Sequence, residues 1–286
     1  MGLLDKKVAI ITGAGGGLGE AYAKLFAQEG ASVVVNDLGG PRDGSGKDAT
    51  YAQKVADAIV KDGGKAVANG SDISSMAGGE ALFNDAIKAF GKVDILVNNA
   101  GILRDGTFAK MSEEQWDSVV RVHLKGTFCV TLPVFKFMKD NGGGVIVNTS
   151  STSGLIGNFG QTNYGAAKAG IAGFTRVLSI EGRKYNIRVW TMSPGALTRM
   201  TEDLQAMRGS SYKPAGPEMV APAMLYMCSE LSGDQTNKIL GVSGQAGVRE
   251  LKIFQAEGWK PEAPYTAQDV AKHADKIFFK EGAKVG

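Results

Sequence analysis

The sequence predicts an α/β protein built on one doubly wound, parallel sheet of seven strands. Short apolar runs rich in valine and isoleucine alternate with amphipathic stretches of helical length along most of the 286 residues. Strands that are apolar on both faces are typical of a parallel sheet covered by helices on both sides. No linker interrupts this alternation before about residue 245, so we expect a single domain over residues 1–245 and a C-terminal extension over residues 246–286.

The predicted elements follow one another in regular order. The first strand covers residues 8–11, and a helix with one apolar face follows over residues 18–29. The other strands are expected at residues 32–35, 65–68, 94–97, 145–147, 187–192 and 239–242. The other helices are expected at residues 48–62, 76–90, 112–139, 164–184 and 217–230.

Two further features concern the helices. Pro133 falls inside the longest predicted helix, which we expect it to bend. Thr266 and Asp269 have a capping-box spacing, which predicts a helix in the C-terminal extension. We expect this helical tail to pack on the domain or on a partner subunit.

Composition and charge exclude several classes of protein. With 32 basic and 29 acidic residues the net charge is +3, which argues against a nucleic-acid partner. Hydrophobic residues make up 43% of the chain, as in a globular protein. Cys129 and Cys228 form no disulfide framework, and no His/Cys cluster suggests a metal. Without a readable targeting signal or a membrane-spanning apolar run, we expect a cytoplasmic protein.

A glycine-rich turn joins the first strand to the first helix. Glycine is unusually abundant, with 40 residues, and residues 12–19 read T-G-A-G-G-G-L-G. Gly13, Gly17 and Gly19 therefore fit the spacing T-G-x-x-x-G-x-G rather than the strict G-x-G-x-x-G. Backbone N–H groups at a helix N-terminus attract an anion, and glycine lets it approach. The turn therefore predicts a pyrophosphate site and a dinucleotide-binding Rossmann fold.

Asp37 ends the second strand, 18 residues after Gly19. A carboxylate at this position can accept hydrogen bonds from the adenosine ribose and would repel a 2′-phosphate. We therefore predict NAD as the cofactor, with NADP less favoured because of this charge. The alternatives are an ordinary turn aspartate at Asp37 and an NADP site that uses the nearby Arg42.

Tyr164 and Lys168 lie four residues apart in a predicted helix and share one of its faces. The free tyrosine pKa of about 10 makes a poor base at neutral pH, and a nearby cation is expected to lower it. Such a tyrosine could exchange a proton with an alcohol or a carbonyl. The alternative is an ordinary pair of exposed side chains on one helix, which would have the same spacing. None of the other six tyrosines, however, has a lysine four residues after it. Upstream, residues 149–154 place hydroxyl groups after the fifth strand, where α/β sheets bind ligands.

Together these residues resemble the short-chain dehydrogenase/reductase family, in family order over residues 6–200. The resemblance implies a catalytic set of Ser151, Tyr164 and Lys168. It implies cofactor-binding roles for Gly13, Gly17, Leu18, Gly19, Asp37, Asp72, Ile73, Asn99, Ala100, Gly101, Tyr164, Lys168, Pro194, Gly195 and Thr198. His123 stands where many members have an asparagine, and either a proton relay or a packed core histidine fits this position.

A narrower resemblance, carried by residues 36–54, 157–164 and the tail through residue 260, is to one branch of this family. That branch is the (3R)-hydroxyacyl-CoA dehydrogenase module of peroxisomal multifunctional enzyme type 2. It implies an oxidoreductase of fatty-acid metabolism that interconverts a secondary alcohol and a ketone, with a 3-hydroxyacyl-CoA as substrate. The family resemblance further implies a homodimer or homotetramer formed through the helices at residues 112–139 and 164–184.

Three alternative functions stay open at this point. Two of them are a 3-oxoacyl carrier-protein reductase and a hydroxysteroid or other secondary-alcohol dehydrogenase, which share the same chemistry. They differ in the lid after Pro194, and residues 196–216 give no sequence pattern that identifies the substrate. A non-catalytic dinucleotide-binding protein is the alternative of another class. We expect such a protein to have a degraded catalytic set, whereas here Ser151, Tyr164 and Lys168 are all present.

Overall fold

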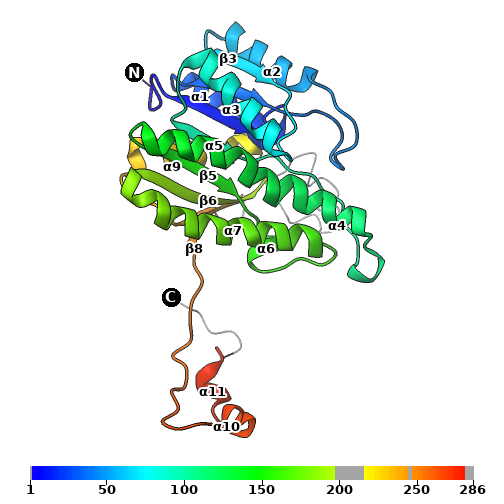
Figure 1. Cartoon of the computed structure of the whole chain (residues 1–286), viewed down its shortest axis with the longest axis vertical. Coiled ribbons are helices and arrows are strands. Elements are labelled where there is room, and N and C mark those ends of the chain that lie inside the picture. Colours follow the sequence, from blue (N-terminus) through cyan, green and yellow to red (C-terminus); the bar gives the residue numbers. More distant parts are fainter. Residues whose placement is uncertain (1, 197–215, 244–246, 281–286) are drawn as a thin grey trace. The chain divides into compact units, whose positions relative to one another are not determined.

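The computed structural model of the chain describes residues 2–196, 216–243 and 247–280. It divides into two compact units, Met1–Glu250 and Leu251–Gly286. The larger unit has one sheet between two layers of helices, as the sequence predicts (Figure 1). Among the residues that the structure describes, every helix is too short or too polar to span a membrane.

The sheet has the strand order β3-β2-β1-β4-β5-β6-β7-β8. Its strands are β1 (Val8–Thr12), β2 (Ser32–Asn36), β3 (Lys65–Asn69), β4 (Ile95–Asn98), β5 (Gly144–Thr149), β6 (Ile187–Gly195), β7 (Ile239–Ser243) and β8 (Gly247–Leu251). All neighbours from β3 to β7 pair in parallel. The order reverses between β1 and β4, and the carboxyl ends of strands at such a switch point form a ligand crevice.

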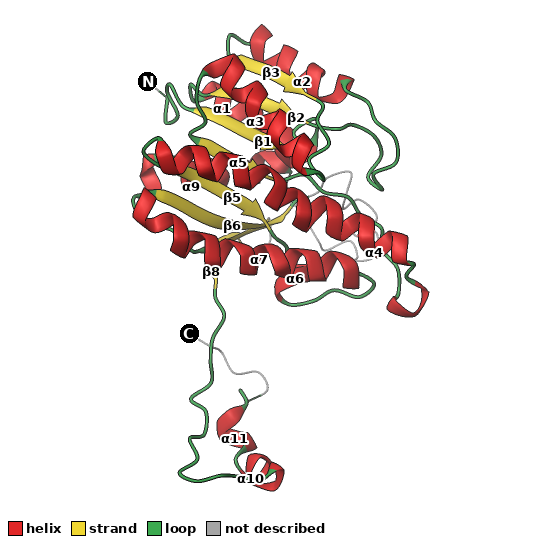
Figure 2. Cartoon of the chain, viewed as in Figure 1, coloured by secondary structure: helices red, strands yellow, loops and turns green. Residues whose placement is uncertain are grey.

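Helices cover both faces of the sheet. They are α1 (Gly17–Gln28), α2 (Thr50–Lys61), α3 (Met76–Phe90), α4 (Glu113–Val120), α5 (Gly126–Asp140), α6 (Thr152–Leu155), α7 (Thr162–Gly182), α9 (Pro217–Cys228), α10 (Ala267–Lys272) and α11 (Ala274–Ile277). Figure 2 shows α3, α5 and α7 over one face. Side chains of α1, α2 and α9 form the buried core on the other face, and those of α3 and α5 form a second core. The sheet is thus buried on both sides, as its continuous apolar strands predict.

One strand was not predicted. β8 is exposed at four of its five residues and ends the strand order at an edge of the sheet. It therefore has no buried apolar run, which is the signal that identified the other seven strands. In the extension, α10 begins where predicted, and Thr266 and Asp269 form both hydrogen bonds of its capping box.

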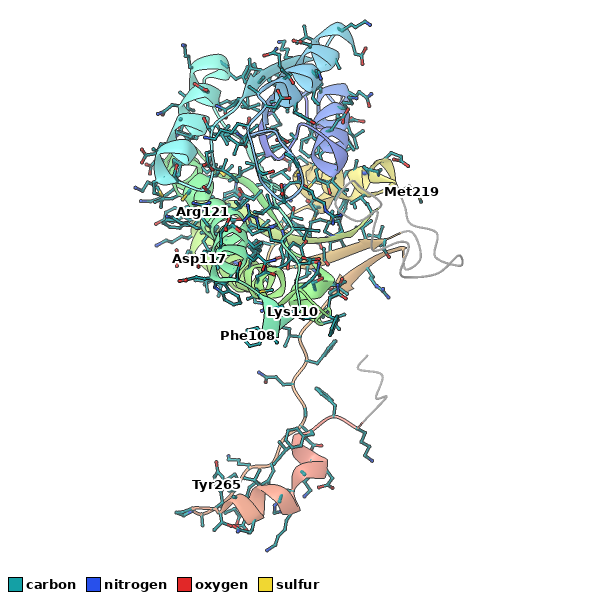
Figure 3. All side chains as sticks on the ribbon, turned by 90° about the vertical axis from the view of Figure 1, so that its right-hand side faces the viewer. Phe108, Lys110, Asp117, Arg121, Met219 and Tyr265 are labelled. Atoms are coloured by element: carbon teal, nitrogen blue, oxygen red, sulfur yellow. The ribbon has the colours of Figure 1, made fainter. Side chains whose placement is uncertain are left out.

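The long helix predicted over residues 112–139 is a helical run of three parts. A π-helical segment, Arg121–Lys125, separates α4 from α5. Pro133 lies inside α5, so this irregular segment comes before the proline that we expected to bend the helix. Asp117 and Arg121 lie at the surface of this run (Figure 3), whereas His123 is buried. Wide turns of this kind often occur at functional sites.

Candidate active site

The glycine-rich turn lies at the carboxyl end of β1, in the predicted crevice. Gly13 and Gly17 have positive φ angles of 64° and 57°, a conformation that favours glycine. A Cβ at Gly13 would also lie 2.6 Å from the Cα of Ala100. α1 begins at Gly17, and its N-cap residue is Gly16, which makes no side-chain cap hydrogen bond. The turn therefore has the backbone that an anion site requires.

Gly19 has a different role from Gly13 and Gly17, because it sets how closely α1 approaches β1. A Cβ at Gly19 would lie 2.2 Å from the carbonyl oxygen of Gly13 and 2.7 Å from Nδ2 of Asn99. Both neighbours are held in place, since Asn99 Nδ2 donates to that same carbonyl over 3.1 Å. Any side chain at this position would push the helix N-terminus away from the turn.

Gly19→Ala is therefore expected to lower the free energy of unfolding by about 1–3 kcal/mol, the usual cost of overpacking. It should also weaken cofactor binding. Chemical denaturation and a fluorescence titration with NADH measure the two effects. Gly173→Ala on α7 is the matched control, because, apart from its chain neighbours and the adjacent backbone of α7, no described atom lies within 4 Å of its Cβ position. A Gly19→Ala protein as stable as the Gly173→Ala protein would contradict the packing role.

Asp37 lies next to the glycine turn, as predicted. Its Oδ2 accepts a hydrogen bond from the Gly15 N–H at 2.8 Å, and its Oδ1 accepts one from the Gly39 N–H at 2.8 Å. These two bonds fix the carboxylate at the carboxyl end of β2. The Asp37 carboxylate is thus held directly beside the glycine turn.

The N-N-A-G motif after β4 holds the glycine turn. Asn99 Nδ2 donates to the carbonyl oxygens of Thr12 and Gly13, at 3.0 and 3.1 Å. The backbone N–H groups of Asn99 and Ala100 both donate to Oγ1 of Thr12, at 3.0 and 3.1 Å. Gly101 follows, where a Cβ would lie 2.1 Å from the His123 ring. We had not singled out the Thr12 hydroxyl, because its partners lie more than 80 residues away in sequence.

The remaining predicted cofactor residues lie at other strand ends. Asp72 and Ile73 follow β3, and Asp72 Oδ1 accepts a hydrogen bond from the Ser74 N–H at 3.0 Å. Pro194 and Gly195 end β6, and Thr198 lies outside the described residues. A glycine turn, an uncapped helix N-terminus and a fixed carboxylate thus meet at the carboxyl ends of β1 and β2. This donor set fits a dinucleotide, with Leu18 in the first turn of α1.

The structure brings the predicted catalytic set together beside this crevice. Ser151 directly follows β5 and caps α6 by accepting the Ser153 N–H at 3.2 Å. Tyr164 and Lys168 lie on α7, with Lys168 Nζ 5.6 Å from the centre of the Tyr164 ring. Lys168 is buried, and its Nζ donates to the Thr149 carbonyl oxygen at 2.6 Å. The sequence did not predict that the Thr149 carbonyl oxygen would accept a hydrogen bond from Lys168.

Burial, rather than the neighbouring cation, controls the protonation of this pair. Burial raises the pKa of Tyr164 to about 12, although its hydrogen bond with Ser151 acts in the other direction. Burial also lowers the pKa of Lys168 to about 7. Our expectation that Lys168 would hold the Tyr164 pKa below its usual value is therefore wrong for the protein without cofactor. Desolvation disfavours both charged forms, so near neutral pH the phenol is protonated and the lysine is only partly charged.

His123 packs against this pair. Its ring meets that of Tyr164 edge-on, with the centres 5.1 Å apart. Its Nε2 lies 3.0 Å from the backbone nitrogen of Ile102 and 2.8 Å from the carbonyl oxygen of that residue. Burial and the charge of Lys168 lower the pKa of His123 to about 3, so the imidazole is neutral. These contacts fit a packed histidine that supports the Tyr164 ring.

Comparison with known proteins finds short-chain dehydrogenases, both by family model and by sequence identity. The family model described as short chain dehydrogenase matches residues 7–209. A putative short-chain type dehydrogenase/reductase of Mycobacterium tuberculosis is 44% identical over 282 residues, covering 99% of this chain and 97% of that protein. Peroxisomal multifunctional enzyme type 2 of Mus musculus is 50% identical over 274 residues, covering 96% of this chain but only 37% of that enzyme.

A solved structure extends the comparison to a ligand complex. The 7α-hydroxysteroid dehydrogenase complexed with NADH and 7-oxo glycochenodeoxycholic acid has a TM-score of 0.76 and 35% sequence identity. The match covers 87% of this chain and 97% of that one. The likeness therefore extends over most of both chains.

Proposed function

The chain belongs to the short-chain dehydrogenase family, and on this premise we propose that it is an NAD-dependent enzyme that oxidises a 3-hydroxyacyl-CoA to its ketone. Membership of the family makes it an oxidoreductase acting on CH–OH groups. The observation that carries the proposal is the convergence of Ser151, Tyr164 and Lys168. Tyr164 hydrogen-bonds Ser151, and Lys168 Nζ lies 5.6 Å from the centre of the Tyr164 ring. A non-catalytic dinucleotide-binding protein has no need of this set.

The proposed mechanism assigns one task to each side chain. The Ser151 hydroxyl hydrogen-bonds the reacting oxygen, and Tyr164 takes the alcohol proton during oxidation and returns it during reduction. Lys168, close to the phenol, stabilises the phenolate when charged. When bound, the nicotinamide supplies the carbon that accepts the hydride and, in its oxidised form, a positive charge. The chain itself contributes orientation and electrostatic stabilisation.

Asp37 supports NAD rather than NADP as the cofactor. Asp37→Asn is expected to raise the ratio of kcat/KM with NADP to kcat/KM with NAD by about tenfold. A like-charge contact near a protein surface costs about 1–4 kcal/mol, and this variant removes it. Asp43→Asn is the matched control, because it removes an exposed charge that hydrogen-bonds Ser45 in the same loop between β2 and α2. If both variants changed the ratio equally, Asp37 would not select the cofactor.

The thioester substrate is supported by similarity and by one surface feature. This chain matches part of an enzyme named for several activities, so that name alone does not assign a substrate. The loop between α6 and α7 carries Ile156 and Phe159, whose exposed fractions are 81% and 87%. These side chains lie a few residues before Tyr164 and offer an apolar surface to an acyl chain.

An initial-rate screen tests the substrate. It compares (3R)-hydroxyacyl-CoAs of several chain lengths with hydroxysteroids and simple secondary alcohols, each with NAD and with NADP. We expect the highest kcat/KM with an acyl-CoA and NAD. A hydroxysteroid dehydrogenase is the second candidate, favoured by the likeness to the 7α-hydroxysteroid enzyme. High activity on a steroid without activity on any thioester would overturn the thioester proposal and favour that second candidate.

We also propose that the protein is a cytoplasmic homodimer or homotetramer. The buried free cysteines Cys129 and Cys228 fit a reducing compartment. α5 carries an exposed Phe128, and α7 carries Val177 and Ile180 with exposed fractions of 57% and 71%. Apolar side chains along two neighbouring helices would be covered by a second copy. A particle of one-chain mass in light scattering would contradict self-association.

A further inference from the structure

Gln161 is a buried side chain with three hydrogen bonds, directly before α7 and three residues before Tyr164. Its Nε2 donates to Oδ2 of Asp105 at 2.7 Å. Its Oε1 accepts from Oγ of Ser153 at 2.8 Å and from Nδ2 of Asn158 at 2.9 Å. One amide therefore connects the segment after β4, the turn after β5 and the start of α7.

The charge of Asp105 determines which way this amide points. An ionised carboxylate only accepts hydrogen bonds, so the NH₂ group of Gln161 must face Asp105. The amide oxygen then faces Ser153 and Asn158, and it is the acceptor for both. With the amide reversed, its oxygen would face the carboxylate and its NH₂ group would face the Asn158 NH₂. Asp105 thus selects the arrangement in which every bond is satisfied.

The same bonds link the two catalytic hydroxyl groups. The backbone of Ser153 donates to Ser151 Oγ, and the side chain of Ser153 donates to Gln161. The carbonyl oxygen of Gln161 accepts the Gly165 N–H at 2.7 Å, within the turn of α7 that carries Tyr164. Ser151 and Tyr164 also hydrogen-bond each other directly. Ser153 and Gln161 therefore form a second path between them, which supports that direct bond from the side. A parallel backbone bridge between Gly106 and Gln161 holds the Gln161 side chain against Asp105.

We propose that Asp105 and Gln161 are positioning residues, which hold the hydroxyl groups of Ser151 and Tyr164 at the separation that proton transfer requires. Neither residue is assigned to touch the substrate. The inference rests on the proposed function, because it concerns the same catalytic set. Small errors in the placement of reacting groups reduce rates strongly, so the effect should appear in kcat rather than in cofactor affinity.

Exchanging the carboxylate and the amide tests this inference. Gln161→Glu places two carboxylates at hydrogen-bond distance and is expected to lower kcat by about tenfold. Asp105→Asn alone should lower kcat less, because the new amide oxygen can still accept from Gln161. In the double variant, the amide introduced at position 105 donates to the carboxylate introduced at position 161, whose oxygens still accept from Ser153 and Asn158. The number of charges equals that of the native chain, so kcat should return to within about threefold of native.

The chain offers a matched control for this exchange. Gln53 Nε2 donates to Asp57 Oδ1 at 2.7 Å on the exposed side of α2. The Gln53→Glu and Asp57→Asn pair makes the same exchange away from the site, and kcat should not change. If Asp105→Asn failed to restore the Gln161→Glu protein, the positioning role would be overturned. Equal thermal stability of native and variant proteins would exclude misfolding as the reason.

A second readout does not require turnover. The ionisation of Tyr164 can be followed by ultraviolet absorbance, as the difference from the same protein carrying Tyr164→Phe. We expect Gln161→Glu to shift this titration and the double variant to restore it. A native chain inactive on every substrate would refute the proposed function, whereas the phenol titration would still test the positioning. An unchanged titration in Gln161→Glu would overturn the positioning role whatever the substrate.

Discussion

Tyr164→Phe is expected to lower kcat for alcohol oxidation by about 10²–10⁴-fold, the usual contribution of a positioned acid–base group. The substitution removes only the hydroxyl that exchanges the proton. The edge-on contact of the ring with His123 should persist, and so should the fold. Steady-state rates with saturating cofactor and substrate measure the loss.

Two controls distinguish lost chemistry from lost structure. NADH should bind the Tyr164→Phe protein about as tightly as it binds the native chain, as measured by fluorescence titration. Tyr185→Phe removes a hydroxyl from the short helix after α7, where the tyrosine ring lies under Lys139 and Lys184, and kcat should not change. A Tyr164→Phe enzyme that kept native turnover would refute the assignment of the base.

Lys168→Met is expected to move the pH dependence of alcohol oxidation. The native pair loses its first proton near pH 7, because burial lowers the pKa of Lys168 to about 7. In the pair that has lost one proton, either the lysine is neutral or the phenol is ionised, and the second form is the active base. We therefore expect kcat/KM for oxidation to rise as the pH increases through about 7. Ketone reduction starts from the pair in which the phenol and the lysine are both protonated, so its kcat/KM should fall as the pH rises through about 7.

Without Lys168, the phenol loses its proton only near its own pKa of about 12. The rise in kcat/KM should then move to strongly alkaline pH, and the rate near neutrality should fall by about 10²–10⁴-fold. His123→Asn is the control, because the pKa of His123 is about 3 and this ring does not titrate near pH 7. The pH midpoint of kcat/KM for the His123→Asn enzyme should equal that of the native enzyme. A Lys168→Met enzyme with the native midpoint would contradict the coupling of the two groups.

The sequence predicted those features that depend on neighbouring residues. The glycine turn, the strand-end position of Asp37 and the four-residue spacing of Tyr164 and Lys168 are local patterns. The structure places each at the carboxyl ends of the parallel strands. Seven strands were found because each is an apolar run. β8 has no such run, since it lies exposed at the end of the strand order.

Features that depend on distant contacts were not predicted. The Thr12 hydroxyl meets Asn99, and Gln161 meets Asp105, across 87 and 56 residues. Residue type and spacing do not reveal such pairs. The raised pKa of Tyr164 was also missed, because it depends on how deeply the folded chain buries the phenol. Thr198 lies outside the described residues, so its cofactor role remains a prediction.

We expect hydride to pass directly from the 3-hydroxyacyl-CoA to NAD, with Tyr164 as the base. The most direct test uses a (3R)-hydroxyacyl-CoA that carries deuterium on the carbon bearing the hydroxyl group. The native protein and NAD should produce reduced cofactor that contains the deuterium, as detected by mass spectrometry, and the Tyr164→Phe protein should produce almost none. Reduced cofactor without deuterium, or equal labelling by both proteins, would contradict this account.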